Sequence, residues 1–338
     1  QTYALAAHAL HQQLLAPLGE LPKRLIFVPS GILGYVPFEV LLTEAPEDPL
    51  QFKQLPYLLR QHQVSYNFSA ALWQEMKQNK ATKARELHLL APSFSTTPQY
   101  ASAADYRRDN LGPLQFNTEE VSGIQSIIGG TIWMGTAATK AQFLAIAPQA
   151  RLLHFATHAK LDDQDEDFSY LAFASTTDSL AAEKLYIREL YAQKIPAELV
   201  VLSACETGVG TIQEGEGIIS LARGFAYAGA GSIVTSLWAV DDQSTARIMT
   251  NFYTYLNQGL SKDEALRQTK LDYLDAAGDQ LEAHPFKWAP FIIIGNADVI
   301  DLSSGIQNLP LWALLGGLLL LGGAGFLWFR KRSSAKGS

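Results

Sequence analysis

Short runs of apolar residues recur along the chain, and stretches with helical spacing separate them. Several runs, such as VVLSA and FIIIG, are continuous rather than alternating, which is typical of strands covered on both faces. Strands of that kind joined by helices form a largely parallel sheet, so the pattern predicts an α/β fold. The predicted strands occupy residues 24–29, 86–91, 130–134, 151–156, 199–204, 232–238 and 290–294.

The segments between these strands carry helix-start signals. Three pairs have the capping-box spacing: Asn117 with Glu120, Thr139 with Gln142, and Ser261 with Glu264. A further helix is predicted over 216–228, ended by the GAG at 229–231, and a leading helix over 3–18. Residues 1–85 form a predicted N-terminal layer or half-domain.

The chain of 338 residues is long enough for a large core, with 48% hydrophobic residues. A net charge of -7 offers no basic surface, which argues against nucleic-acid binding. The sequence begins with Gln1 rather than Met, so we expect a fragment or a processed form. With one cysteine, Cys205, it has no internal disulfide.

Residues 309–329, LPLWALLGGLLLLGGAGFLWF, predict a transmembrane helix. The run carries no charge and as a helix would reach about 30 Å, the thickness of the hydrocarbon core. Arg330, Lys331 and Arg332 follow it, and the positive-inside bias then places the tail in the cytoplasm. We therefore expect a single-pass membrane protein, with a linker over 298–308, a basic tail over 330–338, and the folded domain on the outer (periplasmic or extracellular) face.

Two strand ends carry groups suited to nucleophilic chemistry. The run RLLHFATHA ends at His158, and LVVLSACETG reaches Cys205. Ligands of open parallel sheets bind beyond the carboxyl ends of the strands, so neighbouring strands would bring both residues to one edge. An imidazole there can take the thiol proton, and His158 precedes Cys205 by roughly 50 residues, as in caspases. The backbone N–H of Cys205 can supply half of an oxyanion hole.

Plainer interpretations stay open for these residues. Cys205 is also compatible with a small buried residue, and His158 with a polar strand end. His154, on the strand itself, is expected to pack or hydrogen-bond in the interior. A metal site at His154 and His158 is rejected, because at strand rise they would lie about 13 Å apart. The glycine-rich TGVGTIQEGEG lacks the features of a phosphate-binding loop, and we predict no cofactor.

The chain resembles the CHAT domain family of caspase-like peptidases, which are often joined to tetratricopeptide repeats. Five segments carry the resemblance: VPSGILGYVPFEVLL, HFATHA, VVLSACETG, ARGFAYAGAGSIVTSLWAVDD and WAPFIIIG. It implies a caspase-haemoglobinase-like sandwich, a mostly parallel sheet flanked by helices, with the catalytic domain over 86–297. It also implies tetratricopeptide repeats upstream of residue 1, with separases as relatives.

By match of motif, His158 stands at the catalytic histidine and Cys205 at the nucleophile. Ala159 stands where many members have glycine, and its N–H would be the second oxyanion donor. SLWAVDD resembles the separase segment that lines the S1 pocket with an acid, which implies that Asp242, with neighbouring Asp241, favours a basic P1 residue. Equally, both aspartates can cap the helix that starts near Gln243.

Three functions fit these residues. The first is a thiol endopeptidase that cleaves a protein or peptide partner at the membrane through a Cys205–His158 dyad. The second is a catalytically silent scaffold that keeps the fold and binds partners. The third is an acyltransferase or thioesterase that uses the same dyad. Because both reactive positions are filled, the sequence favours the peptidase.

Overall fold

The computed structural model describes residues 2–78, 86–94, 111–162, 165–175, 183–203, 205–206 and 217–302, with backbone alone at 166, 205–206 and 217–218. The described part belongs to a compact unit that ends at Leu302. The predicted transmembrane helix at 309–329 and the basic tail lie outside the described residues. Within those residues, no helix is both long and apolar enough to cross a bilayer.

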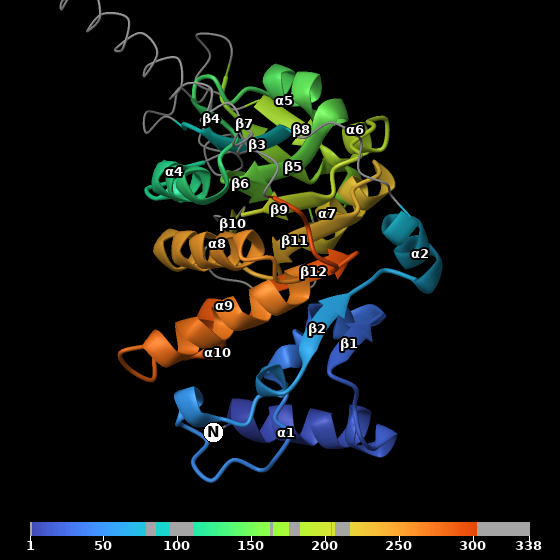
Figure 1. Ribbon diagram of the computed structural model, residues 1–338, viewed down its shortest axis with the longest axis vertical. Coiled ribbons are helices and arrows are strands. Elements are labelled where there is room, and N and C mark those ends of the chain that lie inside the picture. The colour runs from blue at the N-terminus through green and yellow to red at the C-terminus, as the bar shows by residue number, and fades with distance from the viewer. Residues whose placement is uncertain are drawn as a thin grey trace, which may run out of the picture. The chain divides into compact units, whose positions relative to one another are not determined.

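An eight-stranded sheet runs through this unit in the order β1-β2-β12-β11-β9-β5-β3-β4 (Figure 1). Its strands are β1 (Arg24–Phe27), β2 (Gln63–Tyr66), β3 (Glu86–Pro92), β4 (Thr131–Gly135), β5 (Ala150–Phe155), β9 (Leu199–Leu202), β11 (Ser232–Ser236) and β12 (Phe291–Gly295). Among the described strands of this sheet, every neighbouring pair is parallel except β11–β12. The seven predicted strands and the largely parallel sheet are thereby confirmed, whereas β2 was missed.

A second sheet of four short strands has the order β10-β6-β7-β8. Its members are β6 (His158–Lys160), β7 (Tyr170–Phe173), β8 (Glu183–Tyr186) and β10 (Cys205–Glu206). Two- to four-residue strands leave almost no periodicity in a sequence, which is why this sheet was not predicted.

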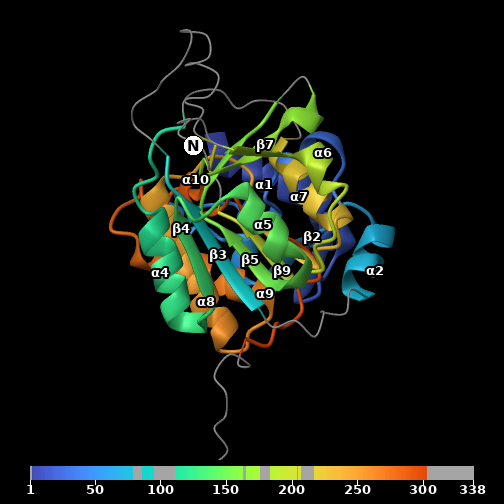
Figure 2. The same ribbon diagram turned by 90° about the horizontal axis from the view of Figure 1, so that it is seen from above.

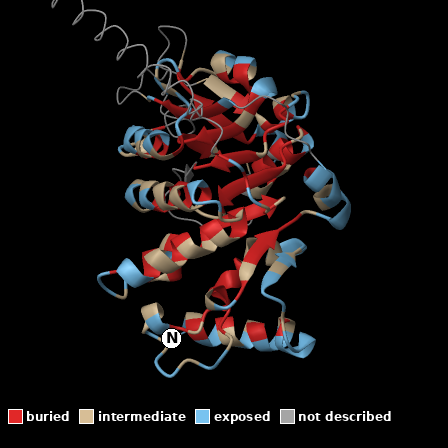
Figure 3. Cartoon of the chain, viewed as in Figure 1, coloured by how far each residue is buried: buried red, intermediate tan, exposed pale blue. Residues whose placement is uncertain are grey.

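Helices cover both faces of the large sheet (Figure 2). The α-helices of the described residues are α1 (Thr2–Leu14), α2 (Ala70–Gln78), α4 (Asn117–Ile128), α5 (Lys140–Ile146), α6 (Ile187–Leu190), α7 (Gly217–Tyr227), α8 (Asp242–Asn257), α9 (Lys262–Ala276) and α10 (Pro285–Trp288). Helices α4, α8 and α9 contribute to one hydrophobic cluster, and α5, α6 and α7 to the other. The strands are buried between these layers, as Figure 3 shows.

Strand β9 illustrates why the sequence shows continuous apolar runs. Leu199 and Val201 lie in the cluster of α8, and the alternate residues Val200 and Leu202 lie in that of α7. Both sets are almost fully buried. A strand with helices on both faces needs an apolar residue at each position, and each such side chain contributes about 1.5–3 kcal/mol on burial.

One of the three capping predictions is confirmed. The Thr139 hydroxyl accepts a hydrogen bond from the Gln142 N–H at 3.0 Å and caps α5. The other two were wrong. Helix α4 has Phe116 at its N-cap, because its first-turn polar residues serve tertiary contacts described below. Ser261 stands at the N-cap of α9, but its hydroxyl donates to Asp263 instead of accepting from the helix.

Candidate active site

The two strands predicted to carry the site are neighbours, and both continue into the small sheet. Strands β5 and β9 pair in parallel up to the partners Phe155 and Leu202. Beyond them, β6 and β10 pair in parallel, and the Cα partner of His158 is Cys205. Neighbouring strands lie about 4.8 Å apart. The backbone therefore brings these two distant residues to adjacent positions, while the Cys205 side chain lies outside those described.

The imidazole of His158 is held in one orientation. Its Nε2 lies 2.6 Å from the carbonyl oxygen of Gly112, and a carbonyl only accepts, so Nε2–H donates this hydrogen bond. The ring of Phe94 packs on it with centroids 4.8 Å apart. Its Nδ1 is buried without a hydrogen-bond partner among the described residues. In the neutral ring, the unshared lone pair is therefore on Nδ1.

The surroundings of His158 favour that neutral ring. Only 1% of its surface is exposed, and burial lowers the pKa of the imidazole below its ordinary value of 6.5. The Gly112 hydrogen bond and the negative charge of Asp242 act in the opposite direction, with smaller effect on the pKa. At neutral pH the ring is thus unprotonated, the state that a general base requires.

The two aspartates predicted for an S1 pocket have different positions. Asp241 is the N-cap of α8: its Oδ1 accepts from the Ser244 N–H at 3.0 Å, and its Oδ2 pairs with Lys287 at 2.8 Å. These contacts lower the pKa of the Asp241 carboxyl against the opposing effect of burial. Asp242 is the first residue of the helix, and its carboxylate accepts a hydrogen bond from the Gln115 N–H at 3.3 Å. Its negative charge acts to raise the pKa of His158. The capping alternative thus describes Asp241, and Asp242 is the one near the imidazole.

The predicted oxyanion donors lie at the junction of the two strands. Ala159 is 3% exposed and is the Cα partner of Glu206, the residue after Cys205. On its other side Ala159 pairs with Leu171 of β7. Ala159 is not among the positive-φ residues of the described chain, so alanine fits there without backbone strain.

A buried polar network supports the strand that leads to His158. The Nε2 atom of His154 lies 2.9 Å from the carboxylate of Glu120, and its Nδ1 lies 3.1 Å from the hydroxyl of Tyr253. The interior position predicted for His154 is confirmed. Glu120 was assigned to a capping box instead, because sequence spacing alone cannot show that the first turn of α4 faces β5.

Sequence reasoning missed several polar groups beside the site. A small cavity of about 10 Å³, with room for one water at most, adjoins Asn117, Glu120, Ser203, Asp242 and Thr245. The side-chain amide of Asn117 donates to the carbonyls of Pro92 and Ala156, and the Ser203 hydroxyl is buried without a partner among the described residues. Its place two positions before Cys205 could have marked Ser203 as a site residue in the sequence. Nothing in the sequence marks the Gly112 carbonyl in this way.

In the described part of the chain, no three His, Cys, Asp or Glu side chains gather in a way that could hold a metal ion. The chemistry available at the site is that of the thiol of Cys205, a neutral imidazole, backbone N–H groups and a carboxylate. Such a set suits acyl transfer through a thioester.

Among the comparisons with known proteins, a family model matches most of the chain. The model of the CHAT domain family matches residues 5–296. Human tetratricopeptide repeat protein 28 is 26% identical over 238 residues, which is 60% of this chain and 9% of that protein. This chain thus spans a small part of the relative's length.

Two solved structures are similar at low identity. The separase–securin complex of Saccharomyces cerevisiae has a TM-score of 0.45 and 14% identity, over 81% of this chain and 15% of that chain. The Arg-specific cysteine proteinase gingipain R has a TM-score of 0.49 and 9% identity, over 88% of this chain and 68% of that chain.

Proposed function

Because this chain belongs to the CHAT domain family, we propose that it is a cysteine endopeptidase with Cys205 as nucleophile and His158 as general base. The observation that carries the proposal is the register of β6 and β10, in which these two residues are Cα partners. His158 is the only histidine in the described strands of the small sheet, and its position beside Cys205 is the one that a thiol–imidazole dyad requires.

The proposed reaction begins with proton transfer from the Cys205 thiol to Nδ1 of His158. The thiolate attacks the scissile carbonyl, and the N–H groups of Cys205 and Ala159 stabilise the oxyanion that forms. His158 then returns the proton to the leaving amine, and a thioester remains. Water, deprotonated by the same imidazole, hydrolyses the thioester and regenerates the thiol. The Gly112 carbonyl stabilises the imidazolium through Nε2–H.

The proposal extends to substrate choice through Asp242. Its carboxylate lies close enough to His158 to affect the pKa of the imidazole, so a substrate residue next to the scissile bond would meet this charge. We infer a preference for a basic P1 side chain, recognised by a charge-assisted hydrogen bond. The proposal assigns this role to Asp242 rather than to Asp241, because the Asp241 carboxylate already accepts from the Ser244 N–H and pairs with Lys287.

Membrane attachment remains part of the proposal on sequence grounds. The apolar run at 309–329 and the basic residues after it support a single-pass anchor with a cytoplasmic tail. The human relative is named a tetratricopeptide repeat protein, which supports repeats as the partner that controls this domain. Protease protection tests the anchor: in vesicles with the cytoplasmic face outward, we expect the tail to be cleaved and the folded domain to be protected. Cleavage of the folded domain with protection of the tail would contradict the orientation.

Labelling with iodoacetamide tests the dyad directly, since Cys205 is the only cysteine in the sequence. The labelling rate of the wild-type chain is measured across pH, beside His158→Ala and a matched control, His8→Ala on α1. We expect thiolate-like reactivity near neutral pH that His158→Ala removes and His8→Ala keeps. A profile centred near the ordinary thiol pKa in all three chains would contradict the proposed dyad.

A peptide library then separates the competing functions. A peptidase cleaves library members, with Cys205→Ala inactive, and the products reveal the P1 residue. A reactive Cys205 that transfers or hydrolyses acyl thioesters without cleaving peptides would indicate the acyl-transfer alternative. An unreactive thiol would indicate the silent scaffold.

A further inference from the structure

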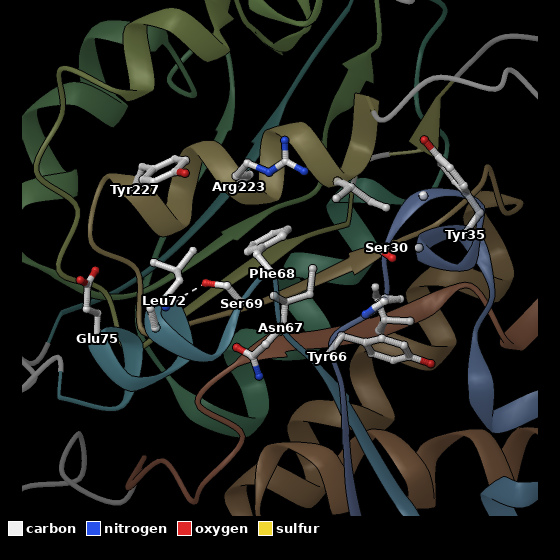
Figure 4. A pocket seen from close by; sticks show the side chains of 17 residues that line it. Ser30, Tyr35, Tyr66, Asn67, Phe68, Ser69, Leu72, Glu75, Arg223 and Tyr227 are labelled. Carbon is white, nitrogen blue, oxygen red and sulfur yellow. Dashed lines mark hydrogen bonds between the residues drawn. The ribbon is translucent and has the colours of Figure 1, made fainter. Parts of the chain in front are cut away.

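The two edges of the large sheet are covered differently. Strands β1, β2 and β12 are parallel to one another, while β12 is antiparallel to β11 and β11 is parallel to β9, so β1 and β2 end at the opposite edge from β5 and β9. There, a pocket of about 600 Å³ opens between α7 and the segments after β1 and β2 (Figure 4). At the edge of the candidate site, the segment 111–117 runs across the strand ends and lines a cavity of about 10 Å³. This segment therefore packs closely over the site.

Side chains, rather than backbone pairing, hold the segment in place. Among the described residues, positions 111–115 make no hydrogen bond to another backbone group. The segment begins at Leu111, which is 8% exposed and lies in an apolar cluster with Tyr170 of β7. It ends at Asn117, whose amide donates to the carbonyls at the ends of β3 and β5. Both ends are thus anchored, and the part between them depends on two further contacts.

The two contacts in the middle of the segment connect the imidazole to a carboxylate. The Gly112 carbonyl accepts from Nε2–H of His158 at 2.6 Å, and the Gln115 N–H donates to Oδ2 of Asp242 at 3.3 Å. Glycine has no side chain to fix its own position, and even a Cβ on Gly112 would meet nothing within 4 Å. Asp242, in contrast, is held by α8, whose N-cap is Asp241. The carboxylate is therefore a fixed point that places the carbonyl.

The orientation of His158 matters because a general base acts only when its lone pair faces the proton that it accepts. With Nε2–H held by the carbonyl, Nδ1 carries that lone pair. We propose that Asp242 is a positioning residue for His158. By holding the Gln115 N–H, it keeps the Gly112 carbonyl in place to accept from Nε2–H. This inference rests on the proposed function, in which His158 is the base. The second oxygen of Asp242, Oδ1, accepts no hydrogen bond from the described residues, so it stays available to a basic P1 side chain.

The test compares two substitutions of Asp242 in the full chain. Asp242→Asn keeps an oxygen that can accept from the Gln115 N–H, whereas Asp242→Ala has none, and both lack the negative charge. Their difference therefore reports the hydrogen bond rather than the charge. Asp241→Ala is the matched control, because it removes the α8 cap and the pair with Lys287 but no contact with the segment 111–117.

NMR spectroscopy with isotope-labelled histidine measures how fast Nε2–H of His158 exchanges with water, and His158→Gln identifies its signal. We expect this exchange to be at least about fivefold faster in Asp242→Ala than in Asp242→Asn, because the hydrogen bond to the Gly112 carbonyl is weakened. Asp241→Ala should resemble the wild type. Equal exchange rates in the two Asp242 variants would overturn the proposal. So would an equally fast exchange in Asp241→Ala, which would assign the effect to the start of α8 as a whole.

Iodoacetamide labelling of Cys205 extends the test to the thiol. Near neutral pH, we expect Asp242→Ala to be labelled at least about fivefold more slowly than Asp242→Asn, because a misplaced imidazole accepts the thiol proton less readily. With a reactive wild-type thiol, equal labelling of the two variants would overturn the positioning role. An unreactive wild-type thiol would instead contradict the proposed dyad, and the exchange of Nε2–H would still decide whether Asp242 positions the ring.

Discussion

A buried ion pair joins the N-terminal segment to the helix that covers the sheet. Lys270 of α9 lies 2.8 Å from the carboxylate of Glu39, and both side chains are at most 3% exposed. The ammonium also donates to the carbonyl of Ala289, and the Tyr66 hydroxyl donates to the second Glu39 oxygen. Burial lowers the pKa of Lys270, with Glu39 acting in the opposite direction. The pair thus depends on both partners being present.

The expected loss in the free energy of unfolding follows from the burial of this pair. Replacing one partner leaves the other charge without compensation, which costs about 3–5 kcal/mol. Lys270→Met and Glu39→Gln should each lose that amount. The double variant contains no buried charge at this place, and the amide oxygen that replaces the carboxylate can still accept from Tyr66, so we expect a loss of only about 1–2 kcal/mol. At an unfolding entropy of about 2.1 cal/mol/K per residue over 1–302, each single variant lowers Tm by roughly 5–8 °C.

Urea unfolding followed by tryptophan fluorescence measures the three free energies, with Lys77→Met as the control. Lys77 pairs with Asp298 at 3.8 Å on an exposed surface, so its loss should cost less than about 1 kcal/mol. Single-variant losses that simply add in the double variant would refute the reasoning, because they would show no coupling between the charges. Losses comparable to the control would show that the segment around residue 39 contributes little to folding.

Four further outcomes are expected. Gly295→Ala should destabilise by at least about 2 kcal/mol in urea unfolding, because φ is +95° and a Cβ would meet Met76 and lie 2.7 Å from the Gly231 oxygen; a neutral effect would contradict the packing. Thr139→Ala should cost about 1 kcal/mol through loss of the α5 cap, measured in the same way. Burial lowers the pKa of His158, so the stability that the neutral imidazole contributes is present above pH 6.5 and is lost as pH falls through the lowered pKa. Between about pH 7.5 and pH 5, the free energy of unfolding of His158→Gln should therefore fall less than that of the wild type. An equal fall in both proteins would contradict the lowered pKa. Asp242→Asn should reduce any preference for a basic P1 residue at least about tenfold in peptide profiling, and an unchanged preference would remove Asp242 from substrate recognition.

The sequence was sufficient for the features that depend on local pattern. Continuous apolar runs located seven strands of the large sheet, because a strand buried on both faces has little choice of residue type. The Thr139 cap was predictable for the same reason: its partner N–H is three residues away. The positions of His158 and Cys205 beyond β5 and β9 followed from the ends of those runs.

Features that depend on contacts between distant segments could not be predicted in this way. The sequence placed Glu120 in a helix cap, while the packing of α4 against β5 turns it toward His154. It offered Asp242, with neighbouring Asp241, as an S1 acid and both aspartates as helix caps, and the start of α8 gives the two residues different contacts.

What the sequence determined by itself is the α/β pattern, the candidate residues His158 and Cys205, and the apolar run at 309–329. Only the tertiary structure decided that the residues after β5 and β9 pair again in a second sheet, that the Gly112 carbonyl fixes the proton on Nε2 of His158, and that a pocket forms between α7 and the segments after β1 and β2. The physical reason is the range of the interactions. Periodicity and caps act within a few residues, whereas strand pairing, hydrogen bonds to distant carbonyls and cavity walls depend on where the whole chain folds.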